Sequence, residues 1–391
     1  MKILLCHNYY RHRGGEEETV FREKELLERN GHEVVLFTRN SREIDNFNFF
    51  QRLISLFEVV FSFLVYRRLK KIIEKESPDI VHVHNIFPLI SPAVYYAAKS
   101  CHIPVVQTLH NYRFLCLNGL FLRNNGRICE KCQKGDFIYG ILNKCYRRSF
   151  MQSLVMAFVL SIHRKIGTFR KKIDCFVAPC RFLKNKLIEA GFPSKKMWVK
   201  PHFTEIYDSA RPEDFKNYAV YIGRLSKEKG LFTLVKAFKK INEVNLKILG
   251  EGAYRERLDN YITEEKIANV SLFGYIKGAE KDKILKRAMF LVLPSEWYEN
   301  MPYAILESFA CGVPVIASSI GGLRELVTDG YNGLLFEPGN AEDLAQKIGR
   351  LAGNKELLLE MRENARKTAE EKYSEKIGYK NLMAVYRRAK I

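Results

Sequence analysis

Short β-rich apolar runs alternate with helical patterns along the chain, and this alternation predicts parallel sheets whose strands are joined by crossover helices. The first half holds five strand candidates, at residues 3–7, 34–38, 80–84, 105–109 and 176–179. The second half holds six, at residues 219–222, 246–249, 270–273, 290–293, 313–317 and 333–336. Two such series in 391 residues predict an α/β protein of two doubly wound domains.

The division between the domains is predicted from composition. The polar segment 204–217, which contains Pro212, is the linker candidate. It separates an N-terminal domain of residues 1–203 from a C-terminal domain of residues 218–365. The last segment, 366–391, is predicted to be a helix that crosses back to the N-terminal domain.

Charge is distributed unevenly between the halves. Residues 1–200 hold 34 Lys and Arg against 17 Asp and Glu, a net charge of +17, whereas residues 201–391 hold 30 against 27, a net charge of +3. Such asymmetry indicates an anionic partner on the first half, which can be a membrane surface, a nucleic acid or an acidic lipid-linked substrate. Nine cysteines are expected to be reduced or metal-bound, because the N-terminus reads as a strand rather than a signal peptide.

Two apolar segments of the basic half have cationic flanks. Residues 53–66 precede Arg67 and Arg68, and residues 154–160 precede Arg164 and Lys165. Both are too short to span a bilayer but suit the interface of an anionic membrane. The alternative for each is a crossover helix buried against the sheet.

The most informative segment for chemistry lies at residues 294–338. A helix is predicted from about Pro302 to Cys311, with Glu299 and Glu307 eight residues apart. On an unbroken helix the two carboxylates would lie about 12 Å apart, too far for acid–base work on one atom but suited to the two ends of an elongated ligand. Helix N-termini attract diphosphates. We therefore expect Glu307 to bind ribose, Glu299 to bind a sugar, and the phosphate to meet the amides near Asn300, Met301, Pro302 and Tyr303.

The same segment resembles the signature of glycosyltransferase family four. Glu299-x7-Glu307 is framed by Pro294-Ser295, by the run Ala310-Cys311-Gly312-Val313-Pro314-Val315 and by Gly321-Gly322. The resemblance extends over nearly the full chain and is strongest in the second half. It implies a GT-B fold, with two Rossmann-like domains around a cleft, and a retaining transfer from a nucleotide-sugar, of the bacterial cell-surface polysaccharide type.

Further positions match this family. The loop 221–230 resembles the one in which an Arg and a Lys face the diphosphate, here Arg224 and Lys229. Gly14 and Gly15 match its glycine pair, where bare backbone approaches the donor. The resemblance places His110 near the donor sugar and acceptor, and Tyr275 in the base pocket. UDP- or GDP-sugar is the expected donor in preference to ADP-sugar, and no catalytic metal is expected.

Four cysteines form a separate candidate site. Cys116, Cys129, Cys132 and Cys145 include one Cys-x2-Cys pair and can offer four thiolates to a structural zinc ion. The spacing differs from the usual doubled pair, so four unrelated reduced thiols remain the alternative. The stretch 110–132 also resembles an insertion found in one bacterial subset of the family.

The combined expectation is a cytoplasmic enzyme, peripheral at the inner face of the membrane, with a lipid-linked or saccharide acceptor. Glu299, His110, Arg224 and Lys229 are its expected catalytic residues. An enzyme of the same fold that makes a soluble disaccharide or polymer remains an alternative. A basic nucleic-acid-binding protein is the alternative from another class, although no recognisable module with interleaved aromatics is present and no nucleic acid is expected. A dehydrogenase is disfavoured because no Gly-x-Gly-x-x-Gly follows residues 3–7.

Overall fold

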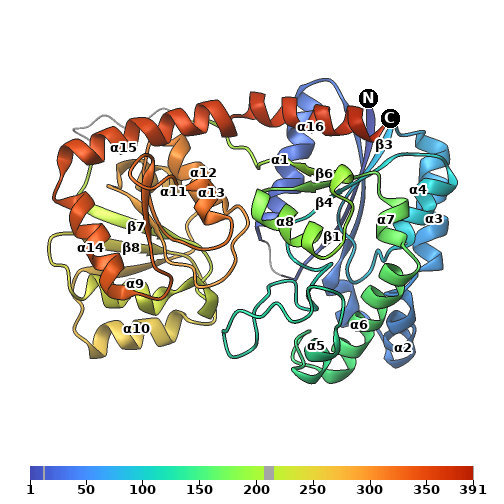
Figure 1. Ribbon diagram of the computed structural model, residues 1–391, viewed down its shortest axis with the longest axis horizontal. Helices are drawn as coiled ribbons and strands as arrows, with labels where there is room; N and C mark the ends of the chain where they lie inside the picture. Colours follow the sequence, from blue (N-terminus) through green and yellow to red (C-terminus); the bar gives the residue numbers. More distant parts are fainter. Residues whose placement is uncertain (12–13, 207–214, 391) are drawn as a thin grey trace. The chain divides into compact units, whose positions relative to one another are not determined.

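The computed structural model describes residues 1–11, 14–206 and 215–390 and divides the chain into two compact units (Figure 1). Unit 1 comprises Met1–Lys200 together with the segment from Tyr379 to the C-terminus, and unit 2 comprises Pro201–Gly378. Each unit is built on one six-stranded parallel sheet. The predicted α/β class with two doubly wound sheets is therefore confirmed.

The sheet of unit 1 has the order β2-β1-β3-β4-β5-β6. Its strands are β1 (Lys2–Tyr9), β2 (Glu33–Asn40), β3 (Ile80–Asn85), β4 (Val105–Thr108), β5 (Cys175–Ala178) and β6 (Met197–Val199). The strand β6 was not among the sequence candidates. The order reverses between β1 and β3, and ligands of such sheets bind at the carboxyl ends of the strands beside this switch point.

The helices of unit 1 connect these strands. They are α1 (Gly15–Arg29), α2 (Phe49–Glu58), α3 (Phe63–Glu76), α4 (Ala93–Ser100), α5 (Ile138–Leu142), α6 (Phe150–Lys165), α7 (Thr168–Lys172) and α8 (Arg181–Glu189). Local capping starts several of them: the Asn48 side chain accepts from the backbone of α2, and the Ser149 side chain accepts from that of α6.

The apolar segment 53–66 does not form one continuous helix. The chain breaks between α2 and α3 and bends by 65°. Ser62 causes the break, because its backbone N–H donates to Ser91 Oγ (2.9 Å) and its own hydroxyl accepts from Val65 N (3.3 Å) at the start of α3. No single described helix is long and apolar enough to cross a membrane, although α2 and α3 taken together reach that length and composition.

The C-terminal region is helical, as its sequence predicts. The helix α15 (Lys355–Thr368) continues through a π-helical turn at Ala369–Tyr373 into α16 (Glu375–Ala389). In unit 1, Leu382, Val385 and Tyr386 of α16 pack into the apolar cluster that contains Ile3 and Leu5. The two ends of the chain also meet at one residue, since Asp79 accepts from Lys2 N (2.8 Å) and pairs with Lys390 (2.7 Å).

The sheet of unit 2 has the order β12-β11-β10-β7-β8-β9, with its switch point between β7 and β10. Its strands are β7 (Tyr218–Ile222), β8 (Asn245–Leu249), β9 (Val270–Gly274), β10 (Leu291–Leu293), β11 (Val315–Ser318) and β12 (Gly333–Phe336). The remaining helices are α9 (Leu231–Phe238), α10 (Arg255–Glu264), α11 (Gly278–Arg287), α12 (Tyr303–Ala310), α13 (Leu323–Leu326) and α14 (Ala341–Ala352). Of the linker candidate 204–217, residues 207–214 lie outside the described residues. Thr204 is buried and bonds to Tyr373 within unit 2.

Candidate functional site

Two loops converge at the switch point of unit 2. One follows β7 and carries Arg224 and Lys229, and the other follows β10 and carries Glu299. Gly230 permits their approach, because a Cβ at this position would lie 1.8 Å from the carbonyl oxygen of Pro294 and its φ is +67°. Only a glycine fits there. The two loops that the sequence singled out separately are thus neighbours.

Glu299 is buried at the centre of this convergence. Its Oε1 accepts from Lys229 Nζ, from Ser295 Oγ (2.8 Å) and from Trp297 Nε1 (2.9 Å). The ammonium of Lys229 also lies 5.4 Å from the Trp297 ring centroid. The predicted catalytic residues Glu299 and Lys229 therefore form a largely buried ion pair, with side chains 7% and 13% exposed.

The Gly321-Gly322 turn supports the backbone of Glu299. Gly322 N donates to the Glu299 carbonyl oxygen (2.7 Å), and a Cβ on Gly322 would lie 2.1 Å from the carbonyl oxygen of Asn300. The glycine pair thus has a mechanical role, because it lets a second backbone segment pack directly against the Glu299 turn.

Glu307 lies on α12, which spans Tyr303–Ala310, close to the predicted bounds of about Pro302 and Cys311. The helix begins at Tyr303, so Glu299 belongs to the preceding turn, and the distance of about 12 Å does not apply. Glu307 is buried and its Oε2 accepts from Lys281 Nζ of α11 (2.7 Å). Each glutamate of the pair thus has its own lysine partner.

Residues 300–303 form the approach to α12. Pro302 is the N-cap, and no side chain caps this end of the helix. Met301 is buried and its sulfur accepts from His202 N (3.1 Å), while the Tyr303 ring stacks on the His202 ring with centroids 5.2 Å apart. Backbone N–H groups at an uncapped helix start are the kind that bind phosphate oxygens.

Arg224 and Tyr275 are the exposed members of the predicted donor site. The Arg224 guanidinium donates to Glu228 Oε1 (2.9 Å), yet its side chain is 62% exposed. Burial opposes ionisation of Glu228, but hydrogen bonding from Ser226 and the charge of Arg224 lower its pKa overall. Tyr275 follows β9 and is exposed, so its predicted contact with a base stays a prediction.

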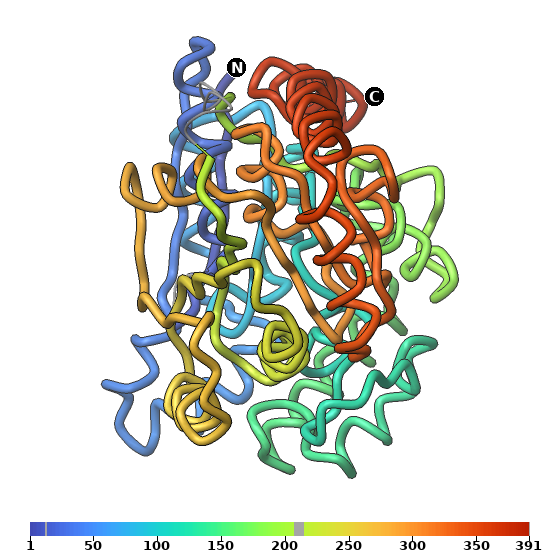
Figure 2. Tube along the Cα trace, turned by 90° about the vertical axis from the view of Figure 1, so that its left-hand side faces the viewer, coloured from blue at the N-terminus to red at the C-terminus, as the bar shows by residue number. Residues whose placement is uncertain are grey.

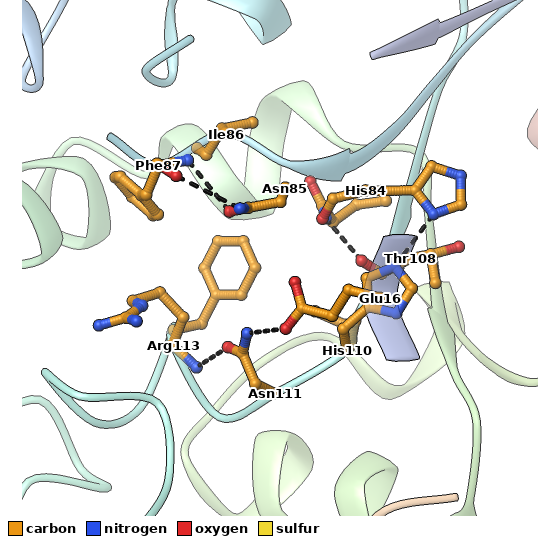
Figure 3. Close-up of a pocket in the computed structure, with 12 residues that line it drawn as sticks. Glu16, His84, Asn85, Ile86, Phe87, Thr108, His110, Asn111 and Arg113 are labelled. Carbon is orange, nitrogen blue, oxygen red and sulfur yellow. Dashed lines mark hydrogen bonds between the residues drawn. The ribbon is translucent and has the colours of Figure 1, made fainter. Parts of the chain in front are cut away.

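Unit 1 has a pocket at the ends of β3 and β4, beside the glycine pair (Figure 3). Gly14 caps α1, and its N–H donates to Glu17 Oε2 (2.8 Å). Glu16, two residues on, lines the pocket and accepts from Asn111 Nδ2 (2.6 Å). Its other oxygen is buried and has no hydrogen-bond partner among the described residues, and burial raises the pKa of Glu16 to about 7.

The predicted catalytic His110 also lines this pocket and leads into a buried chain of polar groups. His110 Nε2 lies 3.0 Å from His84 Nδ1, and His84 Nε2 lies 3.6 Å from Glu23 Oε2. Glu23 is ion-paired through its other oxygen with Lys200 Nζ (2.5 Å). Burial keeps the pKa of His84 well below its ordinary value, so the ring is neutral and can fix the orientation of His110.

Glu23, His82 and His84 are the one group of described residues in which three potential ligand atoms lie within 4.8 Å of one another. The surroundings argue against a metal site, although Glu23 Oε2 and His84 Nε2 have no hydrogen-bond partner among the described residues. Both His82 nitrogens are engaged, with Tyr386 OH (2.8 Å) and Thr108 Oγ1 (2.7 Å), and Lys200 already supplies the cation for Glu23. Burial lowers the pKa of His82 to about 4.

Of the four cysteines of the candidate zinc site, Cys132 and Cys145 both lie beside Gly140: a Cβ on Gly140 would be 3.3 Å from Cys132 Sγ, and Cys145 N donates to the Gly140 carbonyl oxygen (2.9 Å). No three of these thiols meet the 4.8 Å spacing noted above, and the zinc prediction gains no support from the described residues. Burial, followed by the neighbouring Cys116, raises the pKa of Cys132 to about 12 and that of Cys145 to about 11. All nine cysteines are free.

Sequence reasoning missed Glu16, Asn111, Glu23 and Lys200. Glu16 and Asn111 flank the predicted Gly15 and His110, so proximity along the chain could have pointed to them. Glu23 and Lys200 are 177 positions apart, and neither stands in a motif. Their pairing becomes visible only once β6 is known to end beside α1.

Comparisons with known proteins bear on both units. A family model described as Glycosyltransferase Family 4 matches residues 13–206, and one described as Glycosyl transferases group 1 matches residues 203–368. An uncharacterized glycosyltransferase of Methanocaldococcus jannaschii is 29% identical over 307 residues, which are 77% of this chain and 73% of that protein. The 2-deoxystreptamine N-acetyl-D-glucosaminyltransferase of Niallia circulans is 23% identical over 335 residues, 80% of this chain and 77% of that enzyme.

Among solved structures, Anabaena Alr3699/HepE in complex with UDP is similar over 99% of this chain and 100% of its own, with a TM-score of 0.71 and 19% identity. This likeness, together with the two parallel sheets, confirms the expected GT-B fold of two Rossmann-like domains.

Proposed function

Because the chain is a glycosyltransferase of the family 4 type, we propose that it moves a sugar from a nucleotide-sugar to a lipid-linked or saccharide acceptor with retention of anomeric configuration. The observation that carries this proposal is the convergence of Lys229 and Glu299 at the switch point of unit 2. Ligands of doubly wound sheets bind there.

The donor is bound along the β10–α12 segment. Glu307, already held by Lys281, binds the ribose hydroxyls, and the uncapped start of α12 binds the diphosphate. Arg224, whose side chain is largely exposed, closes over the phosphates. We assign a UDP-sugar because the Anabaena structure of the same fold holds UDP.

In the transfer step the bond between the anomeric carbon and the diphosphate oxygen breaks, and a bond to the acceptor oxygen forms on the same face. The acceptor proton passes to the departing diphosphate oxygen. Lys229 and Arg224 stabilise the negative charge that develops there, so no metal ion is needed for this purpose. Glu299 holds Lys229 in place and binds the transferred sugar, with no role as a nucleophile.

The acceptor is recognised in unit 1. Glu16 lines the same pocket as His110, and its Oε2 has no hydrogen-bond partner among the described residues, so a hydroxyl group of the acceptor fits there as a donor. His110, oriented by His84, contacts the donor sugar or this hydroxyl. The +17 charge of residues 1–200 favours an anionic lipid-linked acceptor at a membrane surface over a soluble product, which suits cell-surface polysaccharide synthesis at the inner face of the membrane.

We also propose that the four cysteines bind one structural zinc ion, which would order the segment after His110. This proposal rests on the sequence, on the Cys129-x2-Cys132 pair with Cys116 and Cys145 on either side of it. Metal analysis of the purified protein is expected to give about one zinc per chain, and Cys132→Ser is expected to lower that content. A metal-free wild-type protein with full activity would remove zinc from the proposal.

Donor binding tests the central proposal. UDP-, GDP- and ADP-sugars would be compared for binding by calorimetry and for slow hydrolysis, in the wild type, in Glu307→Ala and in a control, Glu342→Ala, whose carboxylate pairs with Lys240 on the surface. We expect UDP-sugar binding that Glu307→Ala weakens at least tenfold and Glu342→Ala leaves unchanged. Absence of binding to all three donors, or equal binding by Glu307→Ala, would overturn the proposed donor site.

A further inference from the structure

The helix α2 has its apolar stripe in solvent. Phe49, Leu53 and Phe57 are spaced at i, i+4 and i+8, and Phe50 and Ile54 extend the same face. All five are exposed, with Phe50 at 74% and Phe57 at 75%, and no residue of α2 is buried. An amphipathic helix of a globular domain normally turns this stripe to the core. Because the apolar stripe of α2 faces solvent instead, we expect an apolar partner outside unit 1 to cover it.

A second exposed apolar stripe runs along the first turns of α6. Phe150, Leu154 and Phe158 again follow i, i+4 and i+8 spacing, and all are exposed, whereas Met156 and Leu160 on another face are buried. The preceding helix α5 adds Ile138 and Leu142, the latter 64% exposed. This helix pair therefore repeats the arrangement of α2.

The two stripes belong to the same end of unit 1. His163 Nε2 of α6 lies 2.9 Å from the carbonyl oxygen of Val60, in the bend after α2, which ties the two elements together. Figures 1 and 2 both draw α2, α5 and α6 at the lower end of this unit. We call the exposed apolar side chains of α2, α5 and α6 the apolar face.

The sequence around the apolar face is almost free of negative charge. Residues 47–73 hold five Lys and Arg and one Glu, and residues 137–165 hold five Lys and Arg and no acidic residue. Arg67, Arg68, Arg147 and Arg148 are all exposed. Apolar side chains surrounded by cations match the boundary between acyl chains and anionic headgroups.

We propose that the apolar face inserts into the interfacial region of an anionic lipid bilayer and so brings unit 1 to its acceptor. This inference rests on the proposed function for its biological purpose, although lipid binding itself does not depend on catalysis. A second copy of the chain is a poorer occupant, because two-fold packing of this face would bring two sets of exposed cations close together. A helix face that combines aromatic and aliphatic side chains is also typical of helices that lie in the membrane interface.

Vesicle binding tests the inference. Full-length protein would be sedimented with vesicles of phosphatidylcholine alone or with about 30% phosphatidylglycerol, and the variant Phe50→Ser/Phe57→Ser would be compared with Tyr331→Ser, an exposed aromatic of unit 2. We expect the wild type and Tyr331→Ser to bind the anionic vesicles, and the double variant to bind at least tenfold more weakly. High salt should weaken binding without abolishing it, because the apolar part is not screened.

Insertion is checked independently with Phe57→Trp, whose emission should shift to the blue and be quenched by brominated acyl chains. Donor hydrolysis separates the two proposals: the double variant is expected to hydrolyse donor at the wild-type rate, since α2 lies outside the donor site. Unchanged vesicle binding by the double variant would overturn the inference. So would a wild type that ignores vesicles but forms dimers which the double variant loses.

Discussion

Replacing Lys229 with methionine separates the ion pair that this lysine forms in the structure from the catalytic role that we propose for it. Its ammonium pairs with Glu299 inside unit 2, where the two side chains are 13% and 7% exposed. Removing one partner of a buried ion pair costs about 3–5 kcal/mol because the other charge is left uncompensated. Ser295 and Trp297 would still donate to Glu299, so we expect the lower end, about 3 kcal/mol of unfolding free energy.

The double variant Lys229→Met/Glu299→Gln removes both charges and should recover stability to within about 1 kcal/mol of the wild type. Activity should not recover, because the cation that we propose to stabilise the departing diphosphate is absent in both variants. The loss of one such preorganised group lowers kcat by about 100- to 1,000-fold. Stability and activity thus respond differently to the second substitution.

The chain offers a built-in reporter for this measurement. Trp198 lies in unit 1 and Trp297 in unit 2, and the chain has two tryptophans in total. In a Trp198→Phe background, urea unfolding followed by fluorescence reports on unit 2 alone, which avoids the mixed transition of a two-unit protein. Sugar transfer or donor hydrolysis gives kcat. Recovery of activity in the double variant, or a stability loss below about 1 kcal/mol in Lys229→Met, would refute the reasoning.

Three further substitutions follow from the geometry. Gly322→Ala should displace the Asn300 carbonyl and weaken UDP binding at least tenfold in calorimetry. Its control is Gly349→Ala, where a Cβ has open space, and this variant should unfold with the wild-type free energy or with about 0.5–1 kcal/mol more. Glu16→Gln should flatten the pH dependence of the melting temperature between pH 4.5 and 7. Because the pKa of Glu16 is raised in the folded state, the folded protein binds one more proton than the unfolded chain in this window, and its stability falls as the pH rises. Lys200→Met should destabilise unit 1 by about 3–5 kcal/mol, read from Trp198 in a Trp297→Phe background, because Glu23 would remain buried and charged.

Each of these three predictions would be contradicted by one result. Wild-type UDP affinity in Gly322→Ala would show that the Glu299 turn does not shape the donor site. A pH profile that Glu16→Gln leaves unchanged would assign the titration to another group. A Lys200→Met protein as stable as the wild type would mean that water or another cation reaches Glu23.

The second-unit site was largely predictable from the sequence because its residues lie in short loops after strands. Once β7 and β10 are neighbours, Lys229 and Glu299 meet, and both stand in motifs that could be singled out beforehand. The position of Glu299 before α12 was predictable as well, because Pro302 marks the start of the helix.

The first unit was less predictable because its key contacts join distant residues. The break after α2 contains neither proline nor glycine, and it depends on the Ser62–Ser91 bond, which no local pattern reports. The sequence of each apolar segment fits both a buried helix and a membrane-facing helix. Burial decides that question, and burial depends on the whole fold rather than on periodicity.

The packing of α16 has a consequence for the synthesis and folding of the chain. Leu382, Val385 and Tyr386 complete the core that β1 begins, so during synthesis β1 leaves the ribosome long before all of its apolar neighbours are present. Until then Ile3 and Leu5 lack part of their cover, and His82 lacks the hydroxyl of Tyr386. A chain that is cut before α16 would therefore leave the core of unit 1 incomplete around β1.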